Sequence, residues 1–369
     1  MTHRTASGAW YRLWEKPMPR IENYIVNCSI FMYKSEAAAK AGENFGGSGF
    51  LVHVESDSGV RHVYAVTNKH VLDGGFHVIR LTKKTGGVEP VPTAPEDWEH
   101  NPDGNDVAVI PIDVEKSFEV WSVSTDVFIT PEIISIYNIG IGDEAFLVGR
   151  LISHAGKQRN APVTRFGNVS LMADPGELIQ CEGREQEGFL VECRSLTGFS
   201  GSPVFVETFQ EYDGEAGQRV MRHRGNSSIW GKSNANAPGR IERMQGMGNG
   251  AVWIKGKFGP WLLGIDWGHI PLWNPVHEGA SSKSAKTGHW VEANTGIACT
   301  LPAWHILKTI DKPDLMKQRQ ELDHELAEQR KAASISVNDA ALEPSAQTFS
   351  KDDFEAALKK AARKLSSKK

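Results

Sequence analysis

The sequence has few cysteines, and no pair of them has metal-binding or redox spacing. Its 369 residues include only Cys28, Cys181, Cys193 and Cys299, which are scattered without a CxxC motif. This distribution argues against a zinc knuckle and against a disulfide-rich scaffold. We therefore expect four buried free thiols, and the sequence indicates no metal and no organic cofactor.

Long hydrophobic runs are also absent. No stretch approaches the roughly eighteen apolar residues that a membrane-spanning helix needs. Residues 1–20 contain neither a continuous hydrophobic region nor a small-residue cleavage pattern, so we find no secretory signal. We accordingly expect a cytoplasmic protein without a membrane partner.

The chain lacks a strong excess of either charge, since its formal net charge is −4 at pH 7. A nucleic-acid partner is therefore disfavoured. The most basic stretch lies within residues 207–260, which are rich in glycine, asparagine and serine. A long insertion with little regular pattern is either a functional loop or an unstructured one, and both interpretations stay open.

Helical periodicity is nearly absent between residues 21 and 310. Short runs rich in valine, isoleucine and phenylalanine alternate there with turn residues, as in Tyr24–Ile30, Gly49–Val54, Val63–Thr67 and Val107–Ile112. Many short strands at this spacing indicate an all-β sandwich or a pair of barrels. Pro302–Ile310 is the exception, and we expect one short closing helix there.

The composition changes after Asp311, towards lysine, glutamate, glutamine and alanine. Residues 312–369 are therefore predicted to form a charged helical tail, with one helix over Pro313–Ala332 and a second, shorter one after Ser350. A solvated tail and a docking or oligomerisation segment are both compatible with these weakly amphipathic patterns.

Three residues could together activate a nucleophile. His70 follows the apolar run 64–67, Asp106 precedes the run 107–110, and Ser200 lies between two glycines. A serine hydroxyl needs a base to take its proton and backbone donors to hold the developing oxyanion, which a Gly-x-Ser-Gly turn can present. A buried carboxylate would fix the tautomer of the base. Taken singly, each residue also has a purely structural interpretation as a turn or strand-end residue.

Six segments in chain order resemble the trypsin/chymotrypsin-like serine peptidases, in particular their bacterial intracellular and HtrA-like branches. They are Gly47–Val52, Thr67–Val71, Asp106–Ile110, Gly198–Pro203, Leu263–Gly268 and Thr295–Pro302. The order histidine, aspartate, serine is also the order of that family. The resemblance covers about residues 21 to 310, and no PDZ-like segment follows it.

The resemblance implies two antiparallel six-stranded β-barrels with the active site between them, followed by a C-terminal helix and the additional helical tail. It places the first barrel at about residues 21–126 and the second at about 127–300, within a protease domain over 21–311. It implies a catalytic triad of His70, Asp106 and Ser200, with an oxyanion hole formed by the N–H groups of Gly198 and Ser200. The implied activity is that of a serine endopeptidase acting on polypeptides.

Two positions depart from the family pattern. Phe199 stands where the zymogen-activated branch has an aspartate that pairs with a new N-terminal amine, so activation by that route is disfavoured. Control must then come from elsewhere, such as a regulatory protein acting through residues 207–260 or the tail. Asp266 stands where the family usually has a serine, and it would either lie beside Asp106 or point into the substrate cleft. A second carboxylate beside Asp106 would need a cation or additional donors.

The resemblance also implies substrate-binding positions. They are Arg194, Ser195, Thr197, Asp266, Trp267, Gly268, Thr295 and Gly296. Their signals conflict, because Arg194 would favour acidic substrate residues while Gly268 and Gly296 leave room for a larger side chain. We therefore assign no substrate residue. The alternative function is a catalytically silent protein of this fold that binds a partner through its cleft.

Overall fold

The structure is a computed structural model that describes residues 21–151, 156–193, 198–207, 210–213, 218–221, 260–277 and 285–340. The chain divides into two compact units, Met1–Met316 and Lys317–Lys369. The sequence also predicts that residues 1–20 form an N-terminal extension before the protease domain. This extension, most of the insertion 207–260 and the second tail helix lie outside the described residues.

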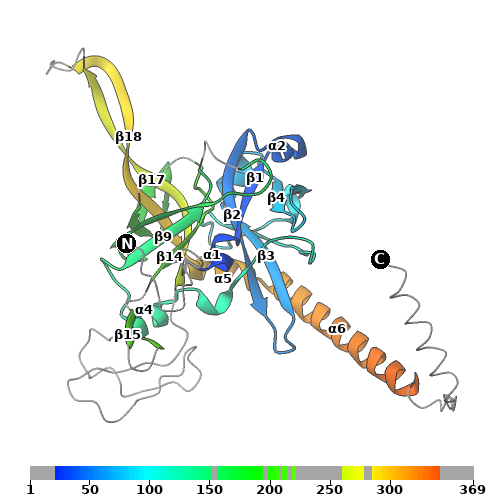
Figure 1. Cartoon of the computed structure of the whole chain (residues 1–369). Coiled ribbons are helices and arrows are strands. Elements are labelled where there is room, and N and C mark those ends of the chain that lie inside the picture. Colours follow the sequence, from blue (N-terminus) through cyan, green and yellow to red (C-terminus); the bar gives the residue numbers. More distant parts are fainter. Residues whose placement is uncertain are drawn as a thin grey trace, which may run out of the picture. The chain divides into compact units, whose positions relative to one another are not determined.

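The N-terminal half of the first unit is an eight-stranded sheet (Figure 1). Its strands are β1 (Ser29–Tyr33), β2 (Phe45–Glu55), β3 (Arg61–Thr67), β4 (Val78–Thr82), β5 (Val88–Pro92), β6 (Glu99–His100), β7 (Ala108–Pro111) and β8 (Val123–Ser124). The order along the sheet is β5-β4-β1-β2-β3-β7-β6, with β8 paired to β2. The sheet has eight strands where the resemblance implied six. The 11-residue strand β2 pairs with β1 through its first half and with β3 and β8 through its second half.

The second half closes into a six-stranded barrel, as the resemblance implied. In barrel order its strands are β10 (Val163–Leu171), β13 (Phe189–Glu192), β18 (Ala285–Pro302), β17 (Trp261–His277), β14 (Pro203–Val206) and β9 (Glu144–Gly149). Two small hairpins accompany it, β11 (Ile179–Cys181) with β12 (Arg184–Gln186), and β15 (Gln210–Asp213) with β16 (Gln218–Met221). The mostly β fold class is therefore confirmed.

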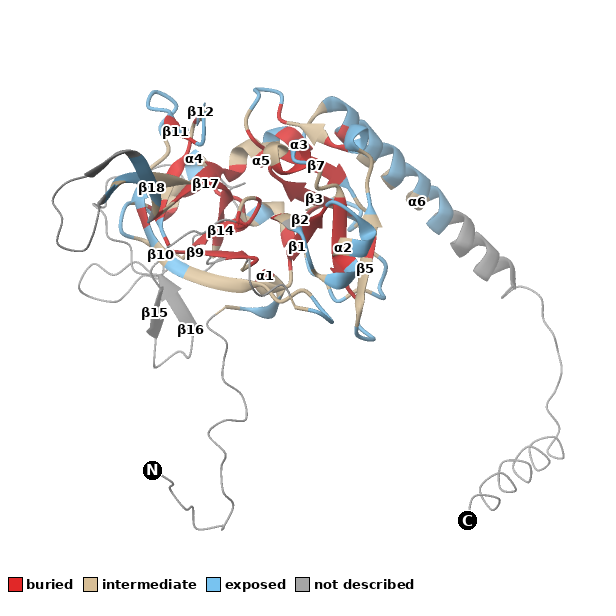
Figure 2. Cartoon of the chain, turned by 90° about the horizontal axis from the view of Figure 1, so that it is seen from above, coloured by how far each residue is buried: buried red, intermediate tan, exposed pale blue. Residues whose placement is uncertain are grey.

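The core is continuous through both halves of this unit, and the buried residues follow the sheet and the barrel (Figure 2). Phe50 and Val52 belong to the cluster that also fills the barrel, whereas Leu51 between them belongs to a second cluster within the sheet. Successive strand residues point to opposite faces, so β2 is covered on both sides. A backbone hydrogen bond from Ser48 of this strand to the Ser200 carbonyl positions the predicted nucleophile beside β2.

The helices are short apart from the last one. They are α1 (Asn23–Val26), α2 (Glu36–Ala41), α3 (Lys69–Asp73), α4 (Pro131–Tyr137), α5 (Ala303–Ile310) and α6 (Pro313–Ala340), with single 3₁₀ turns η1 (Pro95–Asp97) and η2 (Thr125–Val127). Helix α5 confirms the predicted closing helix, and α6 is the predicted tail helix. The strand expected over Tyr24–Ile30 was wrong in its first half, where the chain forms α1 and reaches β1 only at Ser29. No helix in the described ranges is both long and apolar enough to cross a membrane.

Candidate active site

His70 and Asp106 form a close pair that is held by two hydrogen bonds. His70 lies in α3, directly after β3, and its Nδ1 is 2.6 Å from Asp106 Oδ2. The backbone N–H of His70 donates to the other carboxylate oxygen at 2.9 Å. Because Nδ1 faces a carboxylate, it carries the proton, and Nε2 is left as the basic nitrogen.

Asp106 is buried and is bound by the surrounding backbone and side chains. Its carbonyl accepts Asn68 Nδ2 at 2.8 Å, and its N–H donates to Gln186 Oε1 at 3.0 Å. Burial opposes ionisation of Asp106, but hydrogen bonds from His70 and the positive charges of His70 and Arg184 outweigh it and keep the pKa of Asp106 below its ordinary value. Arg184 Nε lies 4.0 Å from Asp106 Oδ2. The carboxylate is therefore kept ionised beside the imidazole.

Ser200 lies in a tight turn that backbone contacts hold against β2. Its carbonyl accepts the N–H of Ser48 at 2.8 Å, and the N–H of Gly201 donates to the carbonyl of Asp266 at 2.8 Å. Gly201 has a φ of +89°, and a Cβ there would come within 1.9 Å of the Ser48 carbonyl oxygen. Only glycine fits this turn, because it combines a left-handed conformation with a close backbone approach.

The turn lies beside the helix that carries His70. A Cβ on Gly47 would lie 3.0 Å from the Ser200 carbonyl oxygen and 2.8 Å from Cγ2 of Val71, the residue after His70. Among the described residues, no hydrogen bond joins the Ser200 hydroxyl to His70. Such bonds are often long in a free enzyme and tighten when substrate binds. The structure thus brings the elements of all three predicted triad residues together.

The predicted oxyanion donors lie in the same turn. Gly198 has a φ of +97°, and its carbonyl accepts the Ser48 hydroxyl at 3.2 Å. The same hydroxyl accepts the N–H of Arg150 at 3.2 Å, so Ser48 ties the turn to the end of β9. Within the described part of the chain, neither Gly198 nor Ser200 donates its N–H to another residue.

Phe199 points away from the site, into the core of the barrel. It is fully buried, and the Arg165 guanidinium lies 5.2 Å from its ring centroid. A buried apolar side chain therefore stands at the position that carries an activating aspartate in the zymogen branch.

Asp266 is buried within β17, with only 1% of its surface exposed. Its N–H donates to the Ser202 carbonyl at 2.9 Å. The charge of Asp266 is one of the causes that raise the pKa of the Cys299 thiol, after a hydrogen bond from Cys181 and burial.

The other predicted substrate-binding residues differ in how far they are buried and in what they contact. Trp267 is fully buried, so its side chain is covered in the free protein. A Cβ on Gly268 would lie 2.9 Å from Cys181 Sγ, whereas Thr295 is exposed and donates its hydroxyl to the Ile270 carbonyl at 2.7 Å. Gly296 has a φ of +82°, and its carbonyl accepts the Cys193 N–H. Arg194, Ser195 and Thr197 lie outside the described residues.

Sequence reasoning missed a second polar cluster next to Asp106. His305 Nε2 lies 2.7 Å from Glu187 Oε2, and its Nδ1 lies 3.0 Å from Asn105 Nδ2. Asn105 precedes Asp106, and Glu187 follows Gln186, so His305 contacts the chain neighbours of the two residues that share the hydrogen bond from Asp106 to Gln186. No motif announces these residues, because their partners are more than 100 positions away.

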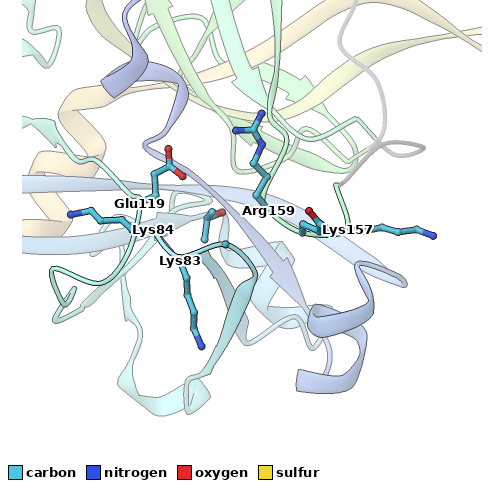
Figure 3. A pocket seen from close by; sticks show the side chains of 8 residues that line it. Lys83, Lys84, Glu119, Lys157 and Arg159 are labelled. Carbon is cyan, nitrogen blue, oxygen red and sulfur yellow. The ribbon is translucent and has the colours of Figure 1, made fainter. Parts of the chain in front are cut away.

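A basic pocket of about 460 Å³ lies away from the predicted triad, and its lining includes Lys83, Lys84, Glu119, Lys157 and Arg159 (Figure 3). Their charged ends point in different directions, and Lys83 is paired with Glu89. This pocket contains none of the predicted site residues. No group of three metal-ligating side chains occurs among the described residues.

The fold and the site together define a class: a mostly β, barrel-containing protein in which a histidine–aspartate pair lies beside a Gly-x-Ser-Gly turn. Residues 47–210 match the model of the trypsin-like peptidase domain family. That segment contains Ser48, His70, Asp106 and Ser200. The resemblance of this segment to the trypsin-like peptidases is thereby confirmed.

Solved structures of proteases are also similar to this chain, at low identity. The MamO protease domain from Magnetospirillum magneticum is 14% identical, with a TM-score of 0.35, covering 54% of this chain and 92% of that one. An inactive mutant form of Rv3671c from M. tuberculosis is 11% identical, with a TM-score of 0.35, covering 80% and 93%. A mutant Tobacco Etch Virus protease is 14% identical, with a TM-score of 0.31, covering 55% and 74%. No curated protein matches the chain.

Proposed function

We propose that this protein is a serine endopeptidase that hydrolyses peptide bonds through His70, Asp106 and Ser200. The observation that carries the proposal is the doubly hydrogen-bonded His70–Asp106 pair beside the Ser200 turn. The trypsin-like peptidase domain supports a peptidase function, since this fold presents polypeptide to such a site. The roles of the three residues are those of the serine-protease triad.

The reaction has two halves. Ser200 Oγ attacks the carbonyl carbon while His70 Nε2 takes its proton, and the oxyanion accepts hydrogen bonds from the N–H groups of Gly198 and Ser200. Ionised Asp106 stabilises the imidazolium that forms. His70 then protonates the leaving amine, which departs and leaves an acyl-enzyme. Water attacks that ester with His70 again acting as the base, which restores Ser200 and releases the acid product.

We further propose a narrow substrate range and control by a partner protein. Buried Phe199 supports this, because it occupies the position of the activating aspartate with a side chain that forms no ion pair. The insertion 207–260 and the tail 312–369 are the proposed contact segments. The four free, buried cysteines are compatible with the cytoplasmic location that we propose. A bacterial source is also part of the proposal.

The experiment is N-terminal profiling of a cell lysate treated with the wild-type protein or with Ser200→Ala. The matched control is Ser202→Ala, which removes a hydroxyl from a buried side chain of the same turn. New N-termini that appear with the wild type and Ser202→Ala but not with Ser200→Ala support the proposal. The same new N-termini with all three proteins contradict it, and their absence with all three favours a silent binding protein.

A further inference from the structure

Strand β17 pairs with β14 in the barrel and continues into a two-stranded ribbon with β18 that leaves the barrel (Figure 1). Its Asp266 carbonyl accepts the Gly201 N–H, which links it directly to the nucleophile turn. Strand β14 pairs with β17 only as far as Ile265, whereas β18 stays paired to it as far as His277. Beyond Asp266, the second edge of β17 therefore has no strand partner within the described residues.

The outer part of the ribbon exposes large apolar side chains. Leu272, Trp273, Trp290 and Val291 have 51%, 56%, 61% and 53% of their surface exposed, and we call them the ribbon patch. Trp273 is opposite Glu292 and Trp290 is opposite Pro275, so the two indoles lie on one face, since alternate residues and cross-strand partners share a face. By the same pairing Leu272 and Val291 lie on the other face. The two indoles on one face form an exposed apolar grouping of the kind that marks an interaction site.

We propose that the ribbon patch docks an extended apolar segment of the polypeptide substrate, upstream of the bond that is cleaved. The inference rests on the proposed peptidase function. A chain that pairs antiparallel with Trp267 and Gly268 and places its scissile bond at Ser200 directs its N-terminal residues along β17 towards the patch. Gly268 and Trp273 are five positions apart, which at about 3.3 Å per residue amounts to roughly 17 Å.

The ribbon favours a substrate chain over a second copy of itself. Pro271 and Pro275 lie in β17 and have no N–H to donate, so this edge is a poor template for continuous strand pairing. Side chains must therefore recognise the substrate chain at this edge. Tryptophan is among the residues that most often dominate such contacts. Glu292, the carboxylate beside Trp273, lies 3.3 Å from His269 Nε2. An apolar segment therefore contacts the two indole rings. The neighbouring carboxylate of Glu292 already has a polar partner in His269.

The test measures binding of an unfolded chain, fluorescein-labelled reduced and carboxymethylated α-lactalbumin, by fluorescence anisotropy. The full-length Ser200→Ala protein is used so that the probe stays intact. It is compared with the same protein carrying Trp273→Thr and Trp290→Thr. The matched control carries Trp121→Thr, because Trp121 is 55% exposed and lies outside the barrel and ribbon strands. Circular dichroism verifies the fold of each variant.

We expect the ribbon-patch variant to bind at least about tenfold more weakly, since hot-spot side chains contribute on this scale, and the Trp121→Thr control to bind as the parent does. Equal affinities in all three proteins, or an equal loss in the control, would overturn the proposal. So would a sedimentation profile that changes from dimer to monomer in the ribbon-patch variant while probe binding is unaffected, because the patch would then serve a second copy.

The proposed function is tested separately by labelling the wild type with a fluorophosphonate. If labelling fails while the ribbon-patch variant still loses probe binding, the peptidase assignment is wrong, and the patch is a polypeptide-binding surface of a silent protein. If labelling succeeds and binding is unchanged in the variant, only the inference about the ribbon patch fails.

Discussion

The side-chain oxygen of Gln186 accepts the backbone N–H of Asp106 at 3.0 Å, which couples the β11–β12 hairpin to the carboxylate that orients His70. The same hairpin brings Arg184 to within 4.0 Å of that carboxylate. The position of Asp106 therefore depends on a hairpin of the second half of the chain as well as on the sheet. This arrangement can be tested one contact at a time.

Replacing Gln186 with leucine should weaken both stability and reactivity. The change leaves the buried N–H of Asp106 without its acceptor, at a cost of about 1–3 kcal/mol of unfolding free energy. Labelling of Ser200 by a fluorophosphonate should slow as well, because Asp106 holds His70 less firmly. Urea unfolding and labelling rates measure the two effects. The control is Gln180→Leu on the neighbouring strand, whose side chain is exposed, and an equal effect there would contradict the account.

Asp106 should make stability depend on pH in the acid range. Its folded pKa lies below the ordinary 3.8, so the ionised carboxylate stabilises the fold above that pH, and this contribution is lost as the pH falls through the folded pKa. The unfolding free energies of wild type and Asp106→Asn should therefore differ more at about pH 6 than at about pH 3. A constant difference, or the same trend in Asp57→Asn at an exposed turn, would be the contrary result.

The same Asp106→Asn substitution should lower turnover by about 10⁴-fold, because an amide favours the wrong imidazole tautomer. Initial rates on a cleaved peptide measure this loss once a substrate sequence is known. A loss of less than about tenfold would show that His70 keeps its tautomer without the carboxylate.

Gly201→Ala should abolish labelling of Ser200. The added Cβ would come within 1.9 Å of the Ser48 carbonyl oxygen, in a backbone with a φ of +89°. Gly59→Ala is the matched control, because Gly59 also has a positive φ, +74°, but no atom within 4 Å of the Cβ position. The control should lose only about 1–2 kcal/mol of stability and keep its labelling. Equal labelling of Ser200 in both variants would show that reactivity does not depend on the close approach of Gly201 to the Ser48 carbonyl.

Phe199→Ala should destabilise the barrel by about 3–5 kcal/mol, since it empties a fully buried aromatic site. Phe166→Ala is the comparison, because Phe166 lies in the same barrel but is half-exposed. Thermal unfolding of the two variants measures the difference. Equal melting temperatures would show that Phe199 is not part of the packed core.

The sequence predicted those parts of the fold that repeat a local pattern. Short strands, the closing helix α5 and the tail helix α6 follow from periodicity and composition. The helices α2 and α4 escaped because six and seven residues are too few to show a helical period. Their ends were nevertheless marked, by Ser35 and Gly42 around α2 and by Thr130 and Asn138 around α4.

Sequence motifs predicted the three proposed triad residues. The contacts that support Asp106 could not be predicted in this way. His70, Asp106 and Ser200 each lie in or next to a recognisable segment. Gln186 and Arg184 carry no motif, and the pairings that bring them to Asp106 form only when the chain has folded. The exposed ribbon was missed for a similar reason, because Trp273 and Trp290 become neighbours only through the register of β17 with β18.

The central claim is that Ser200 is a nucleophile activated by His70. The most direct measurement is labelling of the folded protein with a fluorophosphonate, followed by mass spectrometry of its peptides. The account predicts one adduct, on Ser200, that is absent in Ser200→Ala and strongly reduced in His70→Ala. An unlabelled wild type with its fold intact, or an adduct that persists in Ser200→Ala, would contradict it.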